Sequence, residues 1–258
     1  MAVNILAKYG IKEVADVMFY KINDNGSIGA PVLYLDTLKV STIEQTAEEA
    51  SANGGKGNAP LIIWDYGKEI TVTLEDALFS AKSMALMFGD GDGVGTTITA
   101  IHKTVAYVAD ATNDAGPTKF AGPQGKEYSI ASATDTAIYD ADGVSKGASP
   151  TNLVVGNTYY KTFVMPLKAD TYGDIEISAN SFPGTYYVTG DTYARSETTG
   201  RDEFFQFIIP KAKVQSENTI TLEADGDPSV FNLNLRVLRP ADGIMMRLVK
   251  YDMQEITN

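Results

Sequence analysis

A glycine-rich stretch that carries a lysine is the first place where this sequence could do chemistry. Residues 51–60 read SANGGKGNAP. Its small and polar members are Ser51, Asn53, Gly54, Gly55, Lys56, Gly57 and Asn58. A phosphate-binding loop needs G-x-x-x-x-G-K-[ST] between a strand and a helix, whose first N–H groups hold the anion. Because Gly57 follows Lys56 and the next residues alternate like a strand, the sequence favours a flexible surface loop over a phosphate site.

Clusters of aspartate and glycine are the second candidate, because carboxylates bind calcium. The sequence GDGDGVG contains Asp90. An EF-hand loop counted from Asp90 has Val94 at its fifth position and Ile101 at its twelfth, where it needs oxygen ligands. Similar fragments at Asp140 and Ala224 are more simply Asp-Gly and Asp-Pro turns. We therefore expect no metal site and no cofactor.

The sequence gives little indication of a catalytic nucleophile or of a general acid–base pair. The chain has no cysteine, and its one histidine is His102. It has no G-x-S-x-G sequence of the kind that presents a catalytic serine. Neighbouring acids such as Glu48 and Glu49, or Asp202 and Glu203, point to opposite faces of a strand and cannot act as a pair. The sequence therefore predicts that the protein is not an enzyme and that His102 is a structural or surface residue.

Composition and charge limit the partners. The chain has 258 residues, of which 44% are hydrophobic, and this is enough for a sizeable core. Its net charge is −12, from 33 acidic and 21 basic residues. Such a surface repels phosphate backbones and disfavours nonspecific binding of nucleic acids. No apolar run reaches the length of a membrane span, and the N-terminus lacks a signal-peptide pattern, so we expect a soluble protein made in the cytoplasm.

Alternation with a period of two dominates the elements that would position these residues. It is clearest in EITVTLE and VFNLNLRVLRP, and shorter versions occur in DIEIS and NTITLEA. The apolar members of the two long stretches are Ile70, Val72, Leu74, Phe231, Leu233, Leu235 and Val237. The polar members between them are Glu69, Thr71, Thr73, Asn232, Asn234 and Arg236. This pattern predicts a sheet with one buried face and one solvated face.

One segment has the features of a helix. In TLEDALFSAKSMALMFG, Thr73 could cap the N-terminus with Asp76 three residues later, and Gly89 could end the helix. The sequence therefore predicts a helix over Glu75 to Phe88. The predicted fold is thus mainly β with one flanking helix.

The middle of the chain has a looser pattern. Residues from Tyr139 to Phe163 predict a hairpin with an Asp-Gly turn, followed by a strand. We interpret residues 115–163 as a small β insertion. The main β domain then comprises residues 1–114 and 164–258.

Two stretches carry a family resemblance. They run from Ser41 to Ser80 and from Phe182 to Pro240, on either side of the looser middle. Together they resemble the major tail, or tail tube, proteins of long-tailed bacteriophages. The resemblance implies a tail-tube-type β-sandwich with one flanking helix. It also implies a structural protein of the virion tail, made in the host cytoplasm, with no membrane partner.

The resemblance further implies an assembly. Six copies form a ring, their inner sheets join into one barrel, and the rings stack head to tail into a tube. Further implied partners are the terminator, baseplate or distal tail, and tape-measure proteins. DNA passes through the lumen without specific binding, and the net charge of −12 suits such a passage.

This reading gives the candidate residues their roles. The segment Glu48 to Pro60 becomes an arm that contacts the neighbouring subunit or the next ring and is mobile until it does so. The polar members of the two alternating stretches become residues that face the lumen. We also expect Asp202 to Ile209 to pair with Val230 to Val237.

Two other functions remain open at this point. The first is another β-structural protein of a phage, either a capsid decoration protein or a tail terminator. The second is a carbohydrate-binding β-sandwich, in which tyrosines and Asp-Gly loops form a calcium-assisted site.

Overall fold

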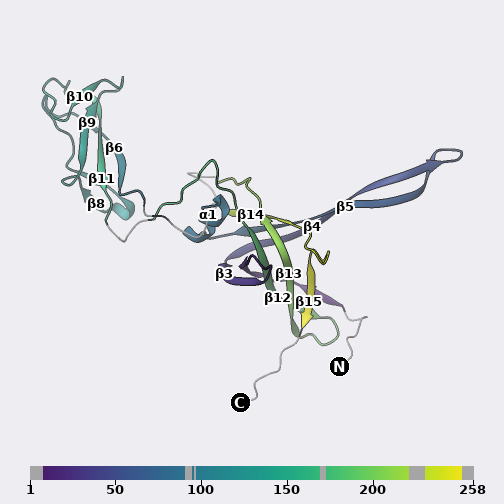
Figure 1. Cartoon of the computed structure of the whole chain (residues 1–258). Helices are drawn as coiled ribbons and strands as arrows, with labels where there is room; N and C mark the ends of the chain where they lie inside the picture. The colour runs from purple at the N-terminus through teal and green to yellow at the C-terminus, as the bar shows by residue number, and fades with distance from the viewer. Residues whose placement is uncertain (1–7, 91–94, 96, 169–172, 221–229, 252–258) are drawn as a thin grey trace, which may run out of the picture. The chain divides into compact units, whose positions relative to one another are not determined.

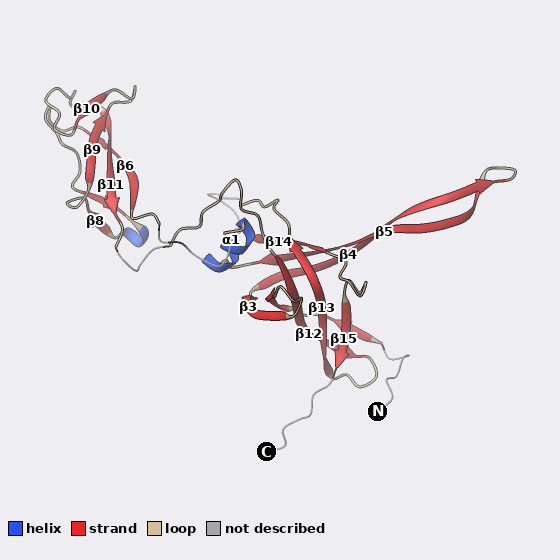
Figure 2. Cartoon of the chain, in the orientation of Figure 1, coloured by secondary structure: helices blue, strands red, loops and turns tan. Residues whose placement is uncertain are grey.

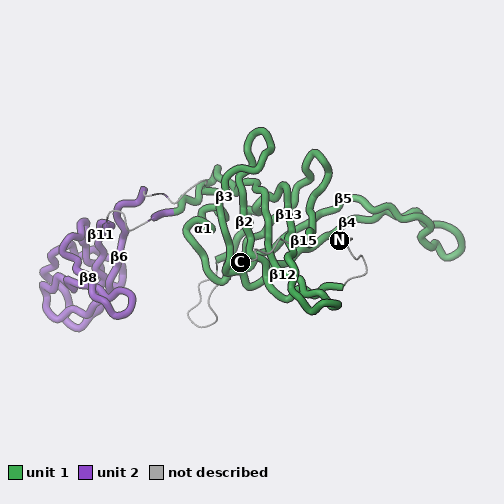
Figure 3. Tube along the Cα trace, turned by 90° about the horizontal axis from the view of Figure 1, so that it is seen from below, with its two compact units in different colours: residues 1–94, 175–258 green, residues 95–174 purple. Residues whose placement is uncertain are grey.

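A computed structural model describes residues 8–90, 95, 97–168, 173–220 and 230–251 of the chain. The fold is mainly β, and it divides into two compact units, coloured separately in Figure 3. The first unit comprises Met1–Val94 and Ile175–Asn258, and the second comprises Gly95–Asp174. The predicted insertion, residues 115–163, lies inside the second unit, whose bounds are wider.

The first unit contains one large sheet and a helix (Figures 1 and 2). The sheet has the order β3-β2-β12-β13-β14-β5-β4, while β1 pairs with β12 and β15 pairs with β13. The elements are β1 Tyr9–Ile11, β2 Asp16–Ile22, β3 Ile28–Leu35, β4 Leu38–Gly54, β5 Ala59–Asp76, α1 Ala81–Phe88, β12 Thr185–Ser196, β13 Asp202–Val214, β14 Phe231–Val237 and β15 Arg247–Tyr251.

One hydrophobic core holds this sheet together. It joins Phe19 of β2 to Leu74 of β5 and Leu235 of β14, although β12 and β13 lie between β2 and β14 in the sheet. The sheet therefore curls so that its two ends face each other, which gives the predicted sandwich-like arrangement. All seven apolar residues of the two long alternating stretches are buried in this core, as predicted. Burial of each large side chain stabilises the fold by about 1.5–3 kcal/mol.

The predicted helix begins later than expected. The alternation of β5 continues to Asp76, so Thr73 lies in a strand and does not cap a helix. The buried Asp76 carboxylate accepts hydrogen bonds from Thr37 Oγ1 (2.5 Å) and from the backbone N–H of Leu78 (3.2 Å), which turns the chain. Helix α1 starts after Ser80, which forms a capping box with Ser83.

The C-terminal end of the helix is where the sequence placed it. Gly89 adopts a φ of 78°, and its N–H donates to the carbonyl oxygen of Ala85. A Cβ at Gly89 would lie 2.4 Å from the backbone of Phe182, so glycine is required both by its φ and by this close approach. The buried Leu86 and Met87 join the core of the first unit.

Three strand predictions need correction. Strands β13 and β14 are neighbours, but they pair through Ala212–Val214 and not through Asp202–Ile209, whose partners are β12 and β15. The DIEIS stretch forms no strand beyond an isolated bridge of Asp174 with Gly95, and its Ile177 is exposed. In NTITLEA, residues 218–220 form no strand and Leu222 lies outside the described residues.

The second unit has its own sheet and core. A sheet of order β10-β9-β11-β6 accompanies the small β7–β8 hairpin. The elements are β6 Ala100–Val108, β7 Lys119–Ala121, η1 Pro123–Gly125, β8 Glu127–Ser129, β9 Thr134–Tyr139, β10 Ser145–Gly147 and β11 Thr158–Pro166. The predicted hairpin with an Asp-Gly turn is β9–β10, and the predicted strand after it is β11.

A small set of buried residues stabilises the second unit. Ala109, Ile138, Leu153 and Tyr159 form a cluster of their own. The Tyr159 hydroxyl accepts a hydrogen bond from the N–H of Val154 at 2.9 Å, so its polar end is satisfied at the edge of this core.

None of the described helices is long and apolar enough to cross a membrane.

Candidate functional site

The six polar residues predicted from the two alternating stretches lie on one face of two paired strands. Strands β5 and β14 are antiparallel, and their register places Thr71 opposite Arg236 and Thr73 opposite Asn234. Because side chains alternate along a strand, Glu69 lies on the same face as Thr71 and Thr73. The sequence therefore identified a continuous surface, although it could not show that the two strands are neighbours.

Direct contacts connect these residues across the strands. Thr73 Oγ1 donates a hydrogen bond to Asn234 Oδ1 at 3.1 Å. The Arg236 guanidinium forms an ion pair with the Glu69 carboxylate, and each side chain is about half exposed. The surface is thus hydrated and weakly held together by cross-strand polar contacts.

Strand β4 extends this surface. Its register with β5 places Thr42 opposite Thr73, Glu44 opposite Thr71 and Thr46 opposite Glu69. We call the surface the polar face, and it comprises Thr42, Glu44, Thr46, Glu69, Thr71, Thr73, Glu75, Asn232, Asn234 and Arg236. The β4 residues were missed, although Thr42, Glu44 and Thr46 alternate in STIEQT and could have been found there.

A second acidic surface lies on β2 and β12. Asp16 and Asp191 are directly opposite each other in the register of these strands. Asp191 accepts hydrogen bonds from Gln206 Nε2 (2.8 Å) and the Tyr251 hydroxyl (3.2 Å), and Asp16 accepts one from Tyr34 (3.3 Å). The negative charge of Asp16 raises the pKa of Tyr34, whereas burial is the main cause that raises the pKa of Tyr251. These donors stabilise the two carboxylates and so offset part of the cost of opposed like charges.

The glycine-rich stretch is the turn of a long hairpin. Strands β4 and β5 stay paired up to Gly54 and Ala59, so only residues 55–58 form the loop. Gly55, Gly57 and Asn58 all have positive φ values, of 77°, 91° and 51°. The turn therefore explains the glycines, because other residues rarely adopt such angles. The stretch is mostly strand, and the surface loop is shorter than predicted.

The outer part of this hairpin leaves the core at a bulge. The register shifts between Thr46 and Glu48, where Gly67 has a φ of 62° and β5 contains one extra residue. A bulge with glycine in this conformation bends and twists a strand. Figures 1 and 2 show β4 and β5 extending beyond the other strands of the first unit. We call residues 48–66 the arm.

The arm exposes apolar side chains on both of its faces. Between 53% and 68% of each large apolar residue of β5 in the arm is accessible. These residues are Leu61, Ile62, Ile63, Trp64 and Tyr66. Within the part of the chain that the structure describes, no strand pairs with the outer edges of the arm, because β14 contacts β5 only from Thr71 to Asp76. The arm is therefore an apolar ribbon with two open edges.

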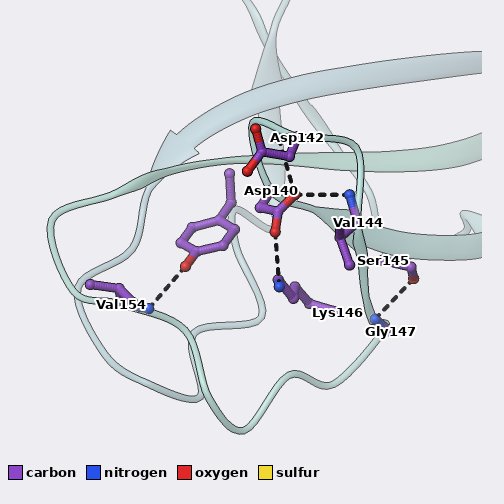
Figure 4. A network of polar contacts seen from close by, with 8 residues as sticks. Asp140, Asp142, Val144, Ser145, Lys146, Gly147 and Val154 are labelled. Atoms are coloured by element: carbon purple, nitrogen blue, oxygen red, sulfur yellow. Dashed lines mark hydrogen bonds and ion pairs between the residues drawn. The ribbon is translucent and has the colours of Figure 1, made fainter.

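The other candidate residues make local contacts in the part of the chain that the structure describes. Asp140 Oδ1 accepts hydrogen bonds from the backbone N–H groups of Asp142 and Val144, and Asp140 Oδ2 pairs with Lys146 at 2.8 Å (Figure 4).

The single histidine, His102, is exposed on β6. No described group of His, Asp and Glu is arranged to hold a metal. Asp90 accepts from the N–H of Glu176 at 3.0 Å. Asp92 and the fragment at Ala224 lie outside the described residues.

Comparisons with known proteins add to this geometry. The model of the YomU/Tube protein family matches residues 9–248. The "Tail tube protein" of Bacillus phage SPR is 26% identical to the chain over 132 residues. That match covers 48% of this chain and 48% of the phage SPR protein, so the chain spans about half the length of this curated relative.

Proposed function

Because the chain belongs to the YomU/Tube protein family, we propose that it is a structural subunit of a phage tail tube and has no catalytic role. In this proposal six copies close into a ring, and the rings stack head to tail into the tube. DNA passes through the lumen without specific binding.

The observation that carries the proposal is the arm. An isolated two-stranded ribbon is marginally stable in water, and open apolar edges promote association with other chains. The arm combines both features, since Ile62 and Trp64 are exposed on one face and Leu61 and Ile63 on the other. A neighbouring copy that covers these faces removes the apolar area from water. Because each copy offers one arm and one receiving surface, the contact is heterologous, and between stacked rings it can repeat along the tube without closing.

The turn of the arm has a specific place in this assembly. We assign Ser51, Asn53, Gly54, Gly55, Lys56, Gly57 and Asn58 to the contact with the neighbouring subunit or the next ring. The glycines among them, and the backbone groups of the turn at residues 55–58, allow close approach to another chain. The contact orders the arm, which is more mobile in the free subunit.

The polar face is the proposed wall of the lumen. Its threonine and asparagine side chains bind water, and its glutamates repel the phosphates of DNA. In a closed ring the open edge of β4 is covered by the neighbouring copy, so the polar faces of all copies join into one surface. Terminator, baseplate or distal tail, and tape-measure proteins then contact the ends and the interior of the tube.

Negative-stain electron microscopy of the purified chain tests the proposal. We expect open tubes of variable length or six-fold rings, because a heterologous contact sets no length. Discrete closed particles that never stack would instead support a capsid decoration protein or a tail terminator. Calcium-dependent retention on a glycan array, without rings or tubes, would support the carbohydrate-binding alternative.

A further inference from the structure

Arg236 is the one cation among the residues that define the polar face, and Lys213, which lies opposite it on β13, donates its Nζ to the carbonyl oxygen of Pro183. The other charged members are Glu44, Glu69 and Glu75. The Arg236 side chain is 51% exposed, so its guanidinium is within reach of a solute in contact with the face. A guanidinium is also the side chain that binds phosphate best, since it can donate two parallel hydrogen bonds. A free arginine here would oppose the passage of DNA.

Glu69 is placed to neutralise the charge of Arg236. Arg236 lies opposite Thr71, and Glu69 is two residues from Thr71 on the same face of β5, so Glu69 and Arg236 are diagonal neighbours. Their side chains form an ion pair through Arg236 Nη2 and Glu69 Oε1. The carboxylate thus occupies donor groups of the guanidinium and cancels its charge locally.

Glu44 provides an internal comparison. It lies opposite Thr71 on the other side of β5, in the same row as Arg236 but two strands away, at roughly 10 Å. Glu44 therefore gives the face the same charge as Glu69 without contacting Arg236.

We propose that Glu69 is a shielding residue, which keeps Arg236 from binding the phosphates of passing DNA. This inference rests on the proposed function. It adds a residue that keeps the affinity of the lumen for DNA low. The effect repeats in every copy around the wall. Each guanidinium that is released can bind one phosphate and free one condensed counterion, so several copies together would retain the duplex.

Three variants of the full chain test this inference. Glu69→Gln frees Arg236, Glu44→Gln makes the same change of charge and leaves the ion pair intact, and the double variant E69Q/R236Q removes the cation. After electron microscopy shows assembly, tubes of each are sedimented with a short DNA duplex at about 50 mM salt. We expect E69Q to retain about tenfold more DNA than wild type, and the excess to disappear near 0.3 M salt. We expect E44Q and E69Q/R236Q to remain close to wild type.

A second readout works on the free subunit. Phenylglyoxal modifies accessible guanidinium groups, and mass spectrometry can follow its addition to Arg236. We expect faster modification of Arg236 in E69Q than in either wild type or E44Q.

The outcomes separate the inference from the proposed function. Equal DNA retention by E69Q and E44Q tubes, or equal labelling of Arg236 in both variants, overturns the shielding role while the tube stands. If the wild-type chain forms neither rings nor tubes, the proposed function fails, and labelling still decides whether Glu69 shields Arg236.

Discussion

Gly190 in β12 lies directly opposite Phe207 in β13, and the aromatic ring covers the glycine. A Cβ at Gly190 would lie 2.1 Å from the Phe207 ring, which is itself buried in the core. We expect Gly190→Ala to lower the free energy of unfolding by about 1–3 kcal/mol, because the ring has no free volume to move into. Urea denaturation of the full chain, followed through the transition of the first unit, measures this change in unfolding free energy.

Gly10 provides the matched control. It lies in β1, which also pairs with β12, and a Cβ there would have no atom within 4 Å. Gly10→Ala should change the stability by less than about 0.5 kcal/mol. A similar loss in both variants would show that the fit between Gly190 and Phe207 is not the cause.

The Asp140 network gives a prediction that depends on pH. The hydrogen bond from Lys146, with those from the backbone N–H groups of Val144 and Asp142, lowers the pKa of Asp140. A carboxyl with a lowered folded-state pKa stabilises the fold above its unfolded value, and this contribution is lost as the pH falls through the folded value. Asp140→Asn should therefore lower the melting temperature of the second unit at pH 7. The difference from wild type should shrink below pH 4.

Asp142→Asn is the control for this experiment. Asp142 joins the network through its backbone N–H, so the substitution changes the same charge and keeps that donor. If Asp140→Asn and Asp142→Asn lower the melting temperature equally at pH 7, net charge and not the Asp140 hydrogen bonds is responsible.

At the scale of elements, substitutions in the arm should impair assembly without changing the stability of the free chain. Ile62 and Trp64 are more than half exposed on one face of the arm. The double variant I62S/W64S should therefore leave the stability of the free chain within about 0.5 kcal/mol of wild type. We expect it to abolish rings and tubes in electron micrographs, because the apolar contact with the neighbouring copy is lost.

Ile177→Ser is the control, since Ile177 is an exposed isoleucine outside the arm. It should assemble like wild type. Hydrogen exchange of residues 48–60 adds an independent measurement, and these amides should be better protected in the tube than in the free subunit. Equal protection in the two states contradicts the role of the arm.

Local sequence patterns predicted some elements well and others poorly. The alternation around Val72 and Leu235 predicted both strands and their buried faces, because a period of two is a local property. The helix start was placed too early because Thr73 and Asp76 have the spacing of a capping box. Asp76 instead ends a strand, and its hydrogen-bond partner Thr37 lies 39 residues earlier in the chain, where a local pattern cannot reveal it. Residues 51–54 were predicted as part of a loop because Ser, Ala, Asn and Gly show no apolar alternation, whereas they pair with β5 as strand residues.

At the scale of the molecule, the two units should unfold separately. The second unit has its own core around Ile138 and Tyr159, and its ends pair in an antiparallel bridge between Gly95 and Asp174. A fragment of residues 95–174 should therefore fold alone and melt cooperatively, as measured by circular dichroism. The full chain should then show two transitions. Gly190→Ala should shift the transition of the first unit and leave unchanged the one that matches the isolated fragment. A fragment with no cooperative transition would contradict this prediction.

The resemblance to tail tube proteins is confirmed at the level of the family and the mainly β fold. The lumen and arm residues stay predictions, because their roles depend on other copies of the chain. The sequence placed the start of the insertion at residue 115, whereas the compact unit starts at Gly95. The cause is β6, which pairs with β11 along its whole length, a long-range relation that no local pattern reveals.

The long strands β4 and β5 have a mechanical consequence. The same two backbones run from the polar face, past Gly67, into the arm. If the arm grips the next ring, both backbones carry a pull on the arm together, because they are joined at the turn of residues 55–58. The ladder between the two strands is then not itself pulled apart. Stretching single tubes in an optical trap should thus show failure between rings before β4 and β5 separate.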